Sequence, residues 1–332
     1  MTSQVHAAIA ANVARAETFA LQDGATHSEI AQAMIRRLTA ESGVPPRYDM
    51  GALYVFEPAE GLWEARHLDQ LAADIGAEFT GLKLCRKHSD YRQIAQLIAT
   101  CASDEDFFVS AEPGIAAAGR FYRIGPGGLL SDEPLTAEHR QRTAMPQAPA
   151  FGEPAPLFER LLDHAFGIGD VGDAQRELLQ MALGAALCGS LWRYRTVIVL
   201  FGPSAAGKST VLEILKAFFP RDRVGAINPQ SWGNEYFAAA LAPLALNLVG
   251  ELDPTTPIQG GVFKAVTGGD PIGARHPTHR PFSFVCQAAH VFNCNRLPPA
   301  AYSRQVAGIL SALSADRVLE LDRAWERGDW PR

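Results

Sequence analysis

The sequence predicts an α/β fold, a parallel sheet with flanking helices, in the second half of the chain, preceded by a mixed α+β and helical region. Residues 196–201 (TVIVLF) form a β-branched run typical of a buried parallel strand. A turn rich in glycine and alanine follows directly. Apolar residues then recur at helical spacing from Val211 to Phe219, and Pro220 ends the helix. Strand, turn and helix in this order indicate a parallel α/β unit.

The turn fits the phosphate-binding pattern G-x-x-x-x-G-K-[ST]. Glycines let the backbone N–H groups of such a loop point at phosphate oxygens. The lysine reaches the β- and γ-phosphates, and the following hydroxyl binds Mg²⁺. The pattern therefore predicts binding of a nucleoside triphosphate, with ATP and Mg²⁺ as the expected cofactors. The residues of the loop are Gly202, Pro203, Ser204, Ala205, Ala206, Gly207, Lys208, Ser209 and Thr210.

Length and composition set the broad class. A chain of 332 residues has room for about two domains. The net charge of −6 argues against a protein that is basic throughout, but leaves room for a local basic patch. The five cysteines are scattered and never form a C-x-x-C pair, which argues against disulfides and zinc and favours a reducing cytoplasm. No long apolar run or secretion signal is present, so we expect no membrane contact.

The first half of the chain is expected to hold short elements. Residues 26–29 (THSE) have capping-box spacing and predict the start of a helix. Helices are also expected at 5–21, 68–79, 90–103, 157–166 and 174–188, two strands within 51–67, and a hairpin within 119–130. Prolines make residues 131–156 the best linker candidate. We accordingly expect an accessory region at 1–150, a helical segment at 151–192 and the ATPase core at 193–332.

Two carboxylates follow the next apolar run. Residues 244–249 (LALNLV) have the length of a buried strand, and Glu251 and Asp253 come directly after it. A phosphate loop needs such an acid to hold Mg²⁺ and polarise the attacking water. Glu251 is the better candidate. Asp253 is the second, and could instead cap the turn before Pro254.

A stretch without acids follows. No Asp or Glu occurs between Pro271 and Ala315. This composition suits a polyanion, although a solvated turn remains the alternative for residues 275–280, which are expected at the tip of a hairpin or loop. The positive and imidazole side chains of the stretch are Arg275, His276, His279, Arg280, His290, Arg296 and Arg304.

Residues 288–292 predict a further strand, and Asn295 would lie near its carboxyl end. Ligands bind at that edge of open α/β sheets. An amide there can hydrogen-bond the γ-phosphate or the attacking water. A lone Asn is otherwise a common turn residue.

These elements together resemble the superfamily 3 helicases, specifically the phage, plasmid and poxvirus primase-helicases. The segments that carry the likeness are GPSAAGKST, GELD, FKAVTGGDPIGAR and FNCNRLP, in that order. The resemblance implies a P-loop NTPase core of the AAA+-like type. It also implies a homo-oligomeric ring, usually a hexamer, with single-stranded DNA in its channel, in a bacterial or phage-infected cell.

By the same resemblance, residues 208 and 209 form the phosphate and Mg²⁺ site. Glu251 is the acidic residue of the metal site and Asn295 is the sensor of the γ-phosphate. The segment around residues 275–280 is the hairpin that engages DNA, and Lys264 belongs to the motif that supports it.

The chain departs from the family in two ways. No segment is long enough for a primase, so any primase is expected in a separate chain. The arginine that reaches the neighbouring subunit's nucleotide has no clear match; Arg304 is nearest and Arg317 is a second candidate. Two alternatives stay open: a small-molecule P-loop kinase with the basic stretch as its lid, and a DNA-binding remnant that binds ATP but hydrolyses it poorly.

Overall fold

The computed structural model describes residues 21–298 except residues 22, 125–129, 168, 203, 278 and 297. The chain divides into two compact units. The first consists of Met1–Ala111 and Thr136–Arg142, and the second of Glu112–Leu135 and Thr143–Arg332. The ranges expected from the sequence, with their functional labels, stay predictions. The helix expected at 5–21 lies almost entirely outside the described residues.

The first unit packs helices against a small antiparallel sheet. Thr26 caps the first of the described helices, and its hydroxyl and the Glu29 carboxylate form the expected capping box. The apolar faces of the helices and sheet enclose a core that includes Ile30, Leu53 and Ile94. The elements are α2 (His27–Ser42), β1 (Arg47–Asp49), β2 (Ala52–Glu57), β3 (Leu62–Arg66), α3 (Leu68–Phe79) and α4 (His88–Cys101).

A buried carboxylate lies at the end of β1. Asp49 is 3% exposed. The backbone N–H groups of Met50 and Phe108 donate to its two oxygens at 2.7 and 3.3 Å. Burial nevertheless raises the pKa of Asp49 to about 6, because the hydrogen bonds and the nearby Arg142 offset only part of the lost hydration.

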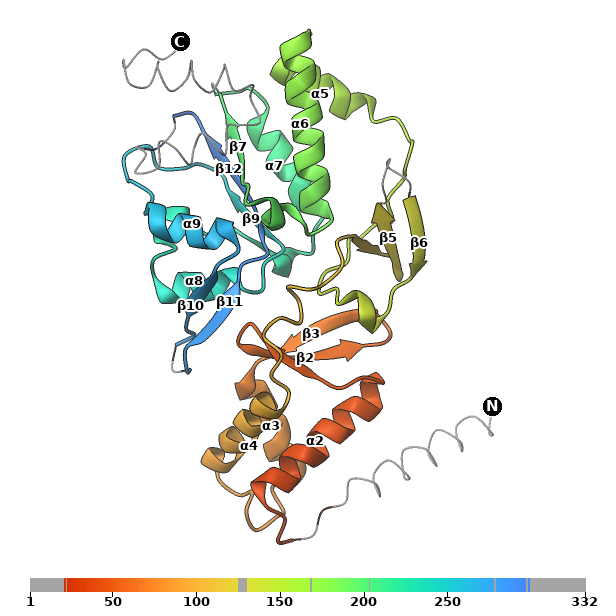
Figure 1. Cartoon of the computed structure of the whole chain (residues 1–332), viewed down its shortest axis with the longest axis vertical. Coiled ribbons are helices and arrows are strands. Elements are labelled where there is room, and N and C mark those ends of the chain that lie inside the picture. The colour runs from red at the N-terminus through yellow and green to blue at the C-terminus, as the bar shows by residue number, and fades with distance from the viewer. Residues whose placement is uncertain are drawn as a thin grey trace. The chain divides into compact units, whose positions relative to one another are not determined.

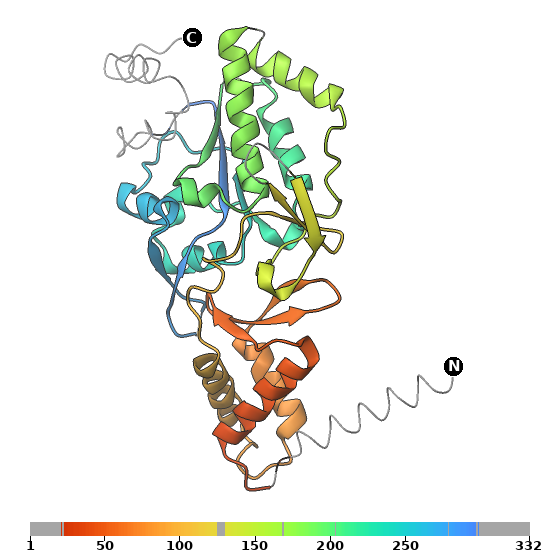
Figure 2. The same ribbon diagram turned by 45° about the vertical axis from the view of Figure 1, so that its right-hand side comes forward.

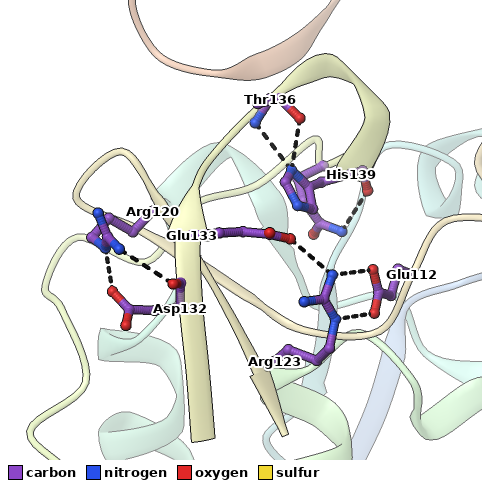
Figure 3. Close-up of polar contacts among 8 residues, drawn as sticks. Glu112, Arg120, Arg123, Asp132, Glu133, Thr136 and His139 are labelled. Atoms are coloured by element: carbon purple, nitrogen blue, oxygen red, sulfur yellow. Dashed lines mark hydrogen bonds and ion pairs between the residues drawn. The ribbon is translucent and has the colours of Figure 1, made fainter.

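The second unit begins with an antiparallel sheet of β4 (Ile115–Ala117), β5 (Arg120–Ile124) and β6 (Leu130–Pro134). Figure 3 shows its charged face: the Arg123 guanidinium bonds the carboxylates of Glu112 and Glu133, and Arg120 bonds Asp132. The hairpin expected within 119–130 is present, but its second strand extends to Pro134. The linker expected at 131–156 is wrong for residues 131–134, because ion pairs and strand pairing hold them in β6.

A helical pair follows, α5 (Pro156–Phe166) and α6 (Asp170–Leu187), as the apolar spacing predicted. Arg176 of α6 bonds both Asp163 of α5 and Asp173, which ties the two helices together. A short 3-10 turn, η3 (Leu191–Tyr194), then leads into the sheet.

The described residues form a parallel sheet of four strands in the order β7-β12-β9-β8. Figures 1 and 2 show α6 and α7 (Lys208–Ala217) on one face and α8 (Glu235–Leu241) and α9 (Gly260–Gly268) on the other. Apolar residues of α6 and α7 pack on the first face. The expected parallel sheet flanked by helices is therefore confirmed. Its strands are β7 (Ile198–Phe201), β8 (Val224–Gly225), β9 (Leu246–Val249) and β12 (Ala289–Cys294).

A second antiparallel pair extends from α9. Strands β10 (Pro271–Ala274) and β11 (Phe282–Val285) form a hairpin, and residues 275–281 connect them. The expected hairpin tip is confirmed. No helix of the described part of the chain has the length and apolar character needed to cross a membrane.

Asp49 makes the stability of the first unit depend on pH. Its pKa in the folded chain, about 6, lies above the ordinary 3.8, so the unfolded chain releases this proton first as the pH rises. The contribution of Asp49 to the free energy of unfolding is therefore complete below about pH 4. It falls by about 3 kcal/mol as the pH rises from there through 6. Urea unfolding between pH 4 and 7 should show this slope in the wild type and lose it in Asp49→Asn.

The exposed Asp106 provides a matched control. Asp106→Asn should retain the slope of the wild type. An Asp49→Asn variant with an unchanged slope would contradict the assignment.

Candidate functional site

The predicted phosphate loop connects β7 to α7. Gly207 precedes α7 with a φ of +81°, a left-handed conformation that glycine adopts without strain. A Cβ at this position would lie 2.9 Å from Leu161 Cδ1 of α5, so the loop also packs closely against the helical pair. The Lys208 ammonium donates to the Gly202 carbonyl oxygen at 2.8 Å. The Lys208 side chain therefore reaches back across the loop to its first residue, Gly202.

The loop ends at the amino terminus of α7. The first N–H groups of a helix have no partner within the helix and carry partial positive charge, which favours an anion. Ser209 and Thr210, in the first turn, are both exposed. Pro203 lies outside the described residues. The arrangement suits a phosphate group.

Ala205 has a left-handed backbone, with a φ of +64°. An L-residue with a Cβ is disfavoured there by about 1 kcal/mol relative to glycine. The exposed loop holds this strain at the point where its backbone turns. Strained residues of this kind concentrate at functional sites.

Strand pairing brings the loop and the first acid together. β12 lies between β7 and β9, with Cys294 opposite Phe201 and Phe292 opposite Val249. Gly202 N–H donates to the Cys294 carbonyl at 3.4 Å. Leu252 N–H donates to the Asn293 carbonyl at 2.9 Å. The predicted phosphate loop and the chain after β9 are thus both attached to the carboxyl end of one strand.

Electrostatics around Cys294 show the same juxtaposition. Burial raises the pKa of its thiol to about 11, while Lys208 lowers it and Glu251 raises it further. Cys294 therefore lies within electrostatic reach of both a cation and an anion. The structure brings the Lys208 and Glu251 side chains to one edge of the sheet, and Glu251 is exposed there.

Asp253 is engaged in a turn. Its Oδ1 accepts from the Thr255 N–H and hydroxyl at 2.8 and 2.6 Å, and its Oδ2 accepts from the Thr256 hydroxyl at 2.6 Å. These bonds lower the pKa of the half-buried Asp253 to about 2. Both oxygens are thus occupied in the way expected for a turn-capping residue. The role of Asp253 as a metal ligand stays a prediction.

The other residue expected at this edge is Asn295, which is exposed just after β12. Sequence reasoning missed Asn293 and Cys294, which are both buried in the strand. Asn293 is 7% exposed, and its Oδ1 has no hydrogen-bond partner among the described residues. The only sequence signal for these two residues is the N-C-N pattern at the end of an apolar strand.

The basic residues of the hairpin tip have different environments. The Arg275 guanidinium donates to Glu235 Oε1 at 2.6 Å and to the Tyr236 hydroxyl at 2.9 Å, which anchors the base of the tip to α8. The His276 ring stacks on Phe282 with ring centroids 5.3 Å apart. Arg280 is exposed.

The remaining candidates lie elsewhere. His279 Nδ1 is 2.8 Å from the Pro277 carbonyl oxygen, within the tip. Lys264 is exposed on α9. His290 was expected to add a donor for a polyanion, and this is wrong: it is 3% exposed beside Trp232, and burial lowers its pKa to about 3. Arg304 and Arg317 lie outside the described residues.

No metal-ligating cluster of three or more His, Cys, Asp or Glu occurs in the described part of the chain. Hard-cation binding at the sheet edge would therefore rest on the Ser209 hydroxyl, the Glu251 carboxylate and the oxygens of a bound phosphate. This donor set fits Mg²⁺, which binds few protein ligands beside substrate phosphates.

Comparison with known proteins gives matches among solved structures but none among family models or curated proteins. No family model matches the chain, and no curated protein matches it. Among solved structures, the A form apo structure of the NrS-1 C-terminal region is similar with a TM-score of 0.47 and 10% identity over 81% of this chain and 56% of that chain. An apo structure of the NrS-1 C-terminal region (305–718) gives 0.44 and 10% over 79% and 56%.

This chain thus spans a little over half the length of those structures, 56%. Similarity of this degree transfers no function.

Replacing Ala205 by glycine should stabilise the protein. The substitution removes the left-handed strain of about 1 kcal/mol, of which the greater freedom of the unfolded chain cancels part. Ala206, with no positive φ, provides the control. Thermal unfolding without nucleotide should give a higher Tm for Ala205→Gly and a lower Tm for Ala206→Gly. Equal shifts in the same direction would contradict the strain.

Proposed function

We propose that this protein is an ATP-dependent DNA helicase, or the helicase module of a larger assembly, in the replication of a phage or other mobile element. The proposed core is a P-loop NTPase of the AAA+-like type. The observation that carries the proposal is the convergence of Lys208 and Glu251 on the carboxyl end of β12. A cation from a phosphate loop and a carboxylate at the end of another strand of the same sheet are two of the protein groups that nucleotide hydrolysis uses.

Lys208 takes part in the proposed mechanism by exchanging partners. In the free loop its ammonium bonds the Gly202 carbonyl. On binding ATP it would transfer to the β- and γ-phosphates, and the α7 N–H groups would bind the same phosphates. The loop thus keeps the ammonium in place and satisfied before the nucleotide arrives.

Glu251 is the proposed acid of the reaction. Its exposed carboxylate can orient the attacking water and accept its proton, and Asn295 can donate to the γ-phosphate. Ser209 and Glu251 would hold Mg²⁺, which would neutralise part of the phosphate charge when bound. The chemical step is therefore proposed to take place between α7 and the end of β9.

Single-stranded DNA is the proposed second ligand, and the β10–β11 hairpin its proposed contact. The hairpin tip carries His276, His279 and Arg280 in a stretch without Asp or Glu. Positive side chains on a projecting loop bind phosphodiesters without reading sequence. We further propose a homo-oligomeric ring, a hexamer by the family resemblance, and a primase in a separate chain if one acts with it.

The kinase alternative has less support. A lid must move over the substrate, whereas residues 282–285 and 289–294 of the basic stretch pair into β11 and β12. The alternative of a poorly hydrolysing remnant depends on the missing arginine, for which the candidates Arg304 and Arg317 are outside the described residues.

Glu251→Gln should bind ATP but hydrolyse it at least about 10²-fold more slowly, because the amide cannot accept the proton of water. Asp253→Asn is the matched control, because the Asp253 carboxylate is occupied by Thr255 and Thr256. It should lower thermal stability and leave most of the hydrolysis rate. The measurements are ATPase rate with and without single-stranded DNA, on protein sized by native mass.

The opposite pattern, with Asp253→Asn as the slower variant, would move the metal and water site to Asp253. A monomeric wild type whose ATPase ignores DNA would overturn the helicase proposal.

A second experiment should distinguish the roles of the two arginines of the hairpin, Arg275 and Arg280. Arg280→Ala should weaken binding to single-stranded DNA and reduce the slope of log K against log salt by about 0.7, the value for one lost phosphate contact. Its Tm should not change. Arg275→Ala should instead lower the Tm, because Glu235 and Tyr236 lose their partner. A smaller salt slope with unchanged Tm for Arg275→Ala would show that Arg275 contacts DNA directly.

A further inference from the structure

The turn between α6 and β7 presents two arginines and a tyrosine next to one another. It comprises residues 192–195 (WRYR), which we call the WRYR turn. Trp192 anchors it: the indole N–H donates to the Gly189 carbonyl at 3.1 Å. A Cβ on Gly269, at the end of α9, would lie 3.5 Å from the Trp192 ring. The turn is therefore held between α6 and α9.

The three residues after the anchor face solvent. Tyr194 is 69% exposed, and Arg193 and Arg195 are also exposed. The Arg193 guanidinium lies over the Trp192 ring, 5.1 Å from its centroid. Between Glu177 and Glu213 the sequence contains no Asp or Glu. The turn is thus a positive and aromatic surface in a chain of net charge −6.

Arg195 occupies a position that glycine would occupy with less strain. Its φ is +54°, in the left-handed region that a residue with a Cβ rarely adopts. It follows the last residue of η3, where glycine is the common choice. An arginine at this position costs backbone strain that glycine would avoid. Strained residues of this kind occur often at functional sites.

We propose that the WRYR turn is a contact site for single-stranded nucleic acid, separate from the hairpin tip. A base stacks on the exposed Tyr194 ring, and Arg195, with Arg193 beside it, pairs with the flanking phosphates. Aromatic rings interleaved with positive charge are the common chemistry of single-strand binding, whereas an acidic peptide would not need the tyrosine. The proposal rests on the proposed function only in taking its polymer to be a single strand.

The position of the turn gives the contact a route to the nucleotide site. It precedes β7, and the phosphate loop follows the same strand. The three steps of about 3.3 Å between its four residues separate the two ends of β7 by about 10 Å. A nucleic acid bound at the turn would therefore act on the amino end of the strand that carries the phosphate loop.

The test is fluorescence anisotropy of a labelled oligothymidylate with the full chain at several salt concentrations. Tyr194→Ala should weaken binding by about 5- to 150-fold, the range for one lost base stack. Tyr194→Phe should bind as the wild type does, because the ring remains. Arg195→Gly should reduce the salt slope by about 0.7. It should also raise the Tm, because glycine relieves the left-handed strain.

Two controls define the outcome. Arg36→Ala removes an exposed arginine from α2, in the other unit, and should change neither affinity nor salt slope. On an oligonucleotide with abasic positions, Tyr194→Ala should cause no further loss. Variants that bind as the wild type does would overturn the proposal while the helicase proposal stands. A wild type that binds no single strand would overturn both. Equal losses on intact and abasic strands would exclude stacking, and so overturn the proposed contact.

Discussion

The parallel pairing of β12 with β7 on one side and β9 on the other is the interaction on which the candidate site depends. These three strands come from segments separated by tens of residues. Their carboxyl ends meet at one edge only because the backbone ladder holds them in this register. Gly202 and Leu252 extend the ladder by donating to Cys294 and Asn293. The loop and the acid therefore depend on one buried strand for their position.

Several locally destabilising features are concentrated at this edge of the sheet. Ala205 has a left-handed backbone, Asn293 has a buried oxygen without a partner among the described residues, and Cys294 is a buried thiol near two opposite charges. The apolar faces of α6 and α7 pack on the sheet below and supply the compensating burial. A well-packed sheet can thus hold a strained loop whose backbone geometry suits a phosphate. The strain is local, and its cost is small against the burial of the core.

Several side chains that suit ligand chemistry are instead used by the fold. Asp253 accepts from Thr255 and Thr256, Arg275 bonds Glu235 and Tyr236, and His290 is buried beside Trp232. A side chain that is already hydrogen-bonded or buried is less able to bind a ligand. The composition of a segment counts these side chains as available, but the fold leaves only some of them exposed. Glu251 and Arg280 are among those that remain exposed.

Periodicity and turn chemistry in the sequence were sufficient to predict the capped helix at residues 27–42, the hairpins and the parallel α/β unit, whereas the phosphate loop stays a prediction. These features depend on residues close together in the chain, whose spacing and backbone preferences act locally. The strand order, the burial of His290 and Asn293, the bonds of Arg275 to Glu235 and Tyr236, and the exposure of the WRYR turn could not be read in this way. They depend on contacts between segments far apart in the chain, which form only when the sheet and its helices pack together.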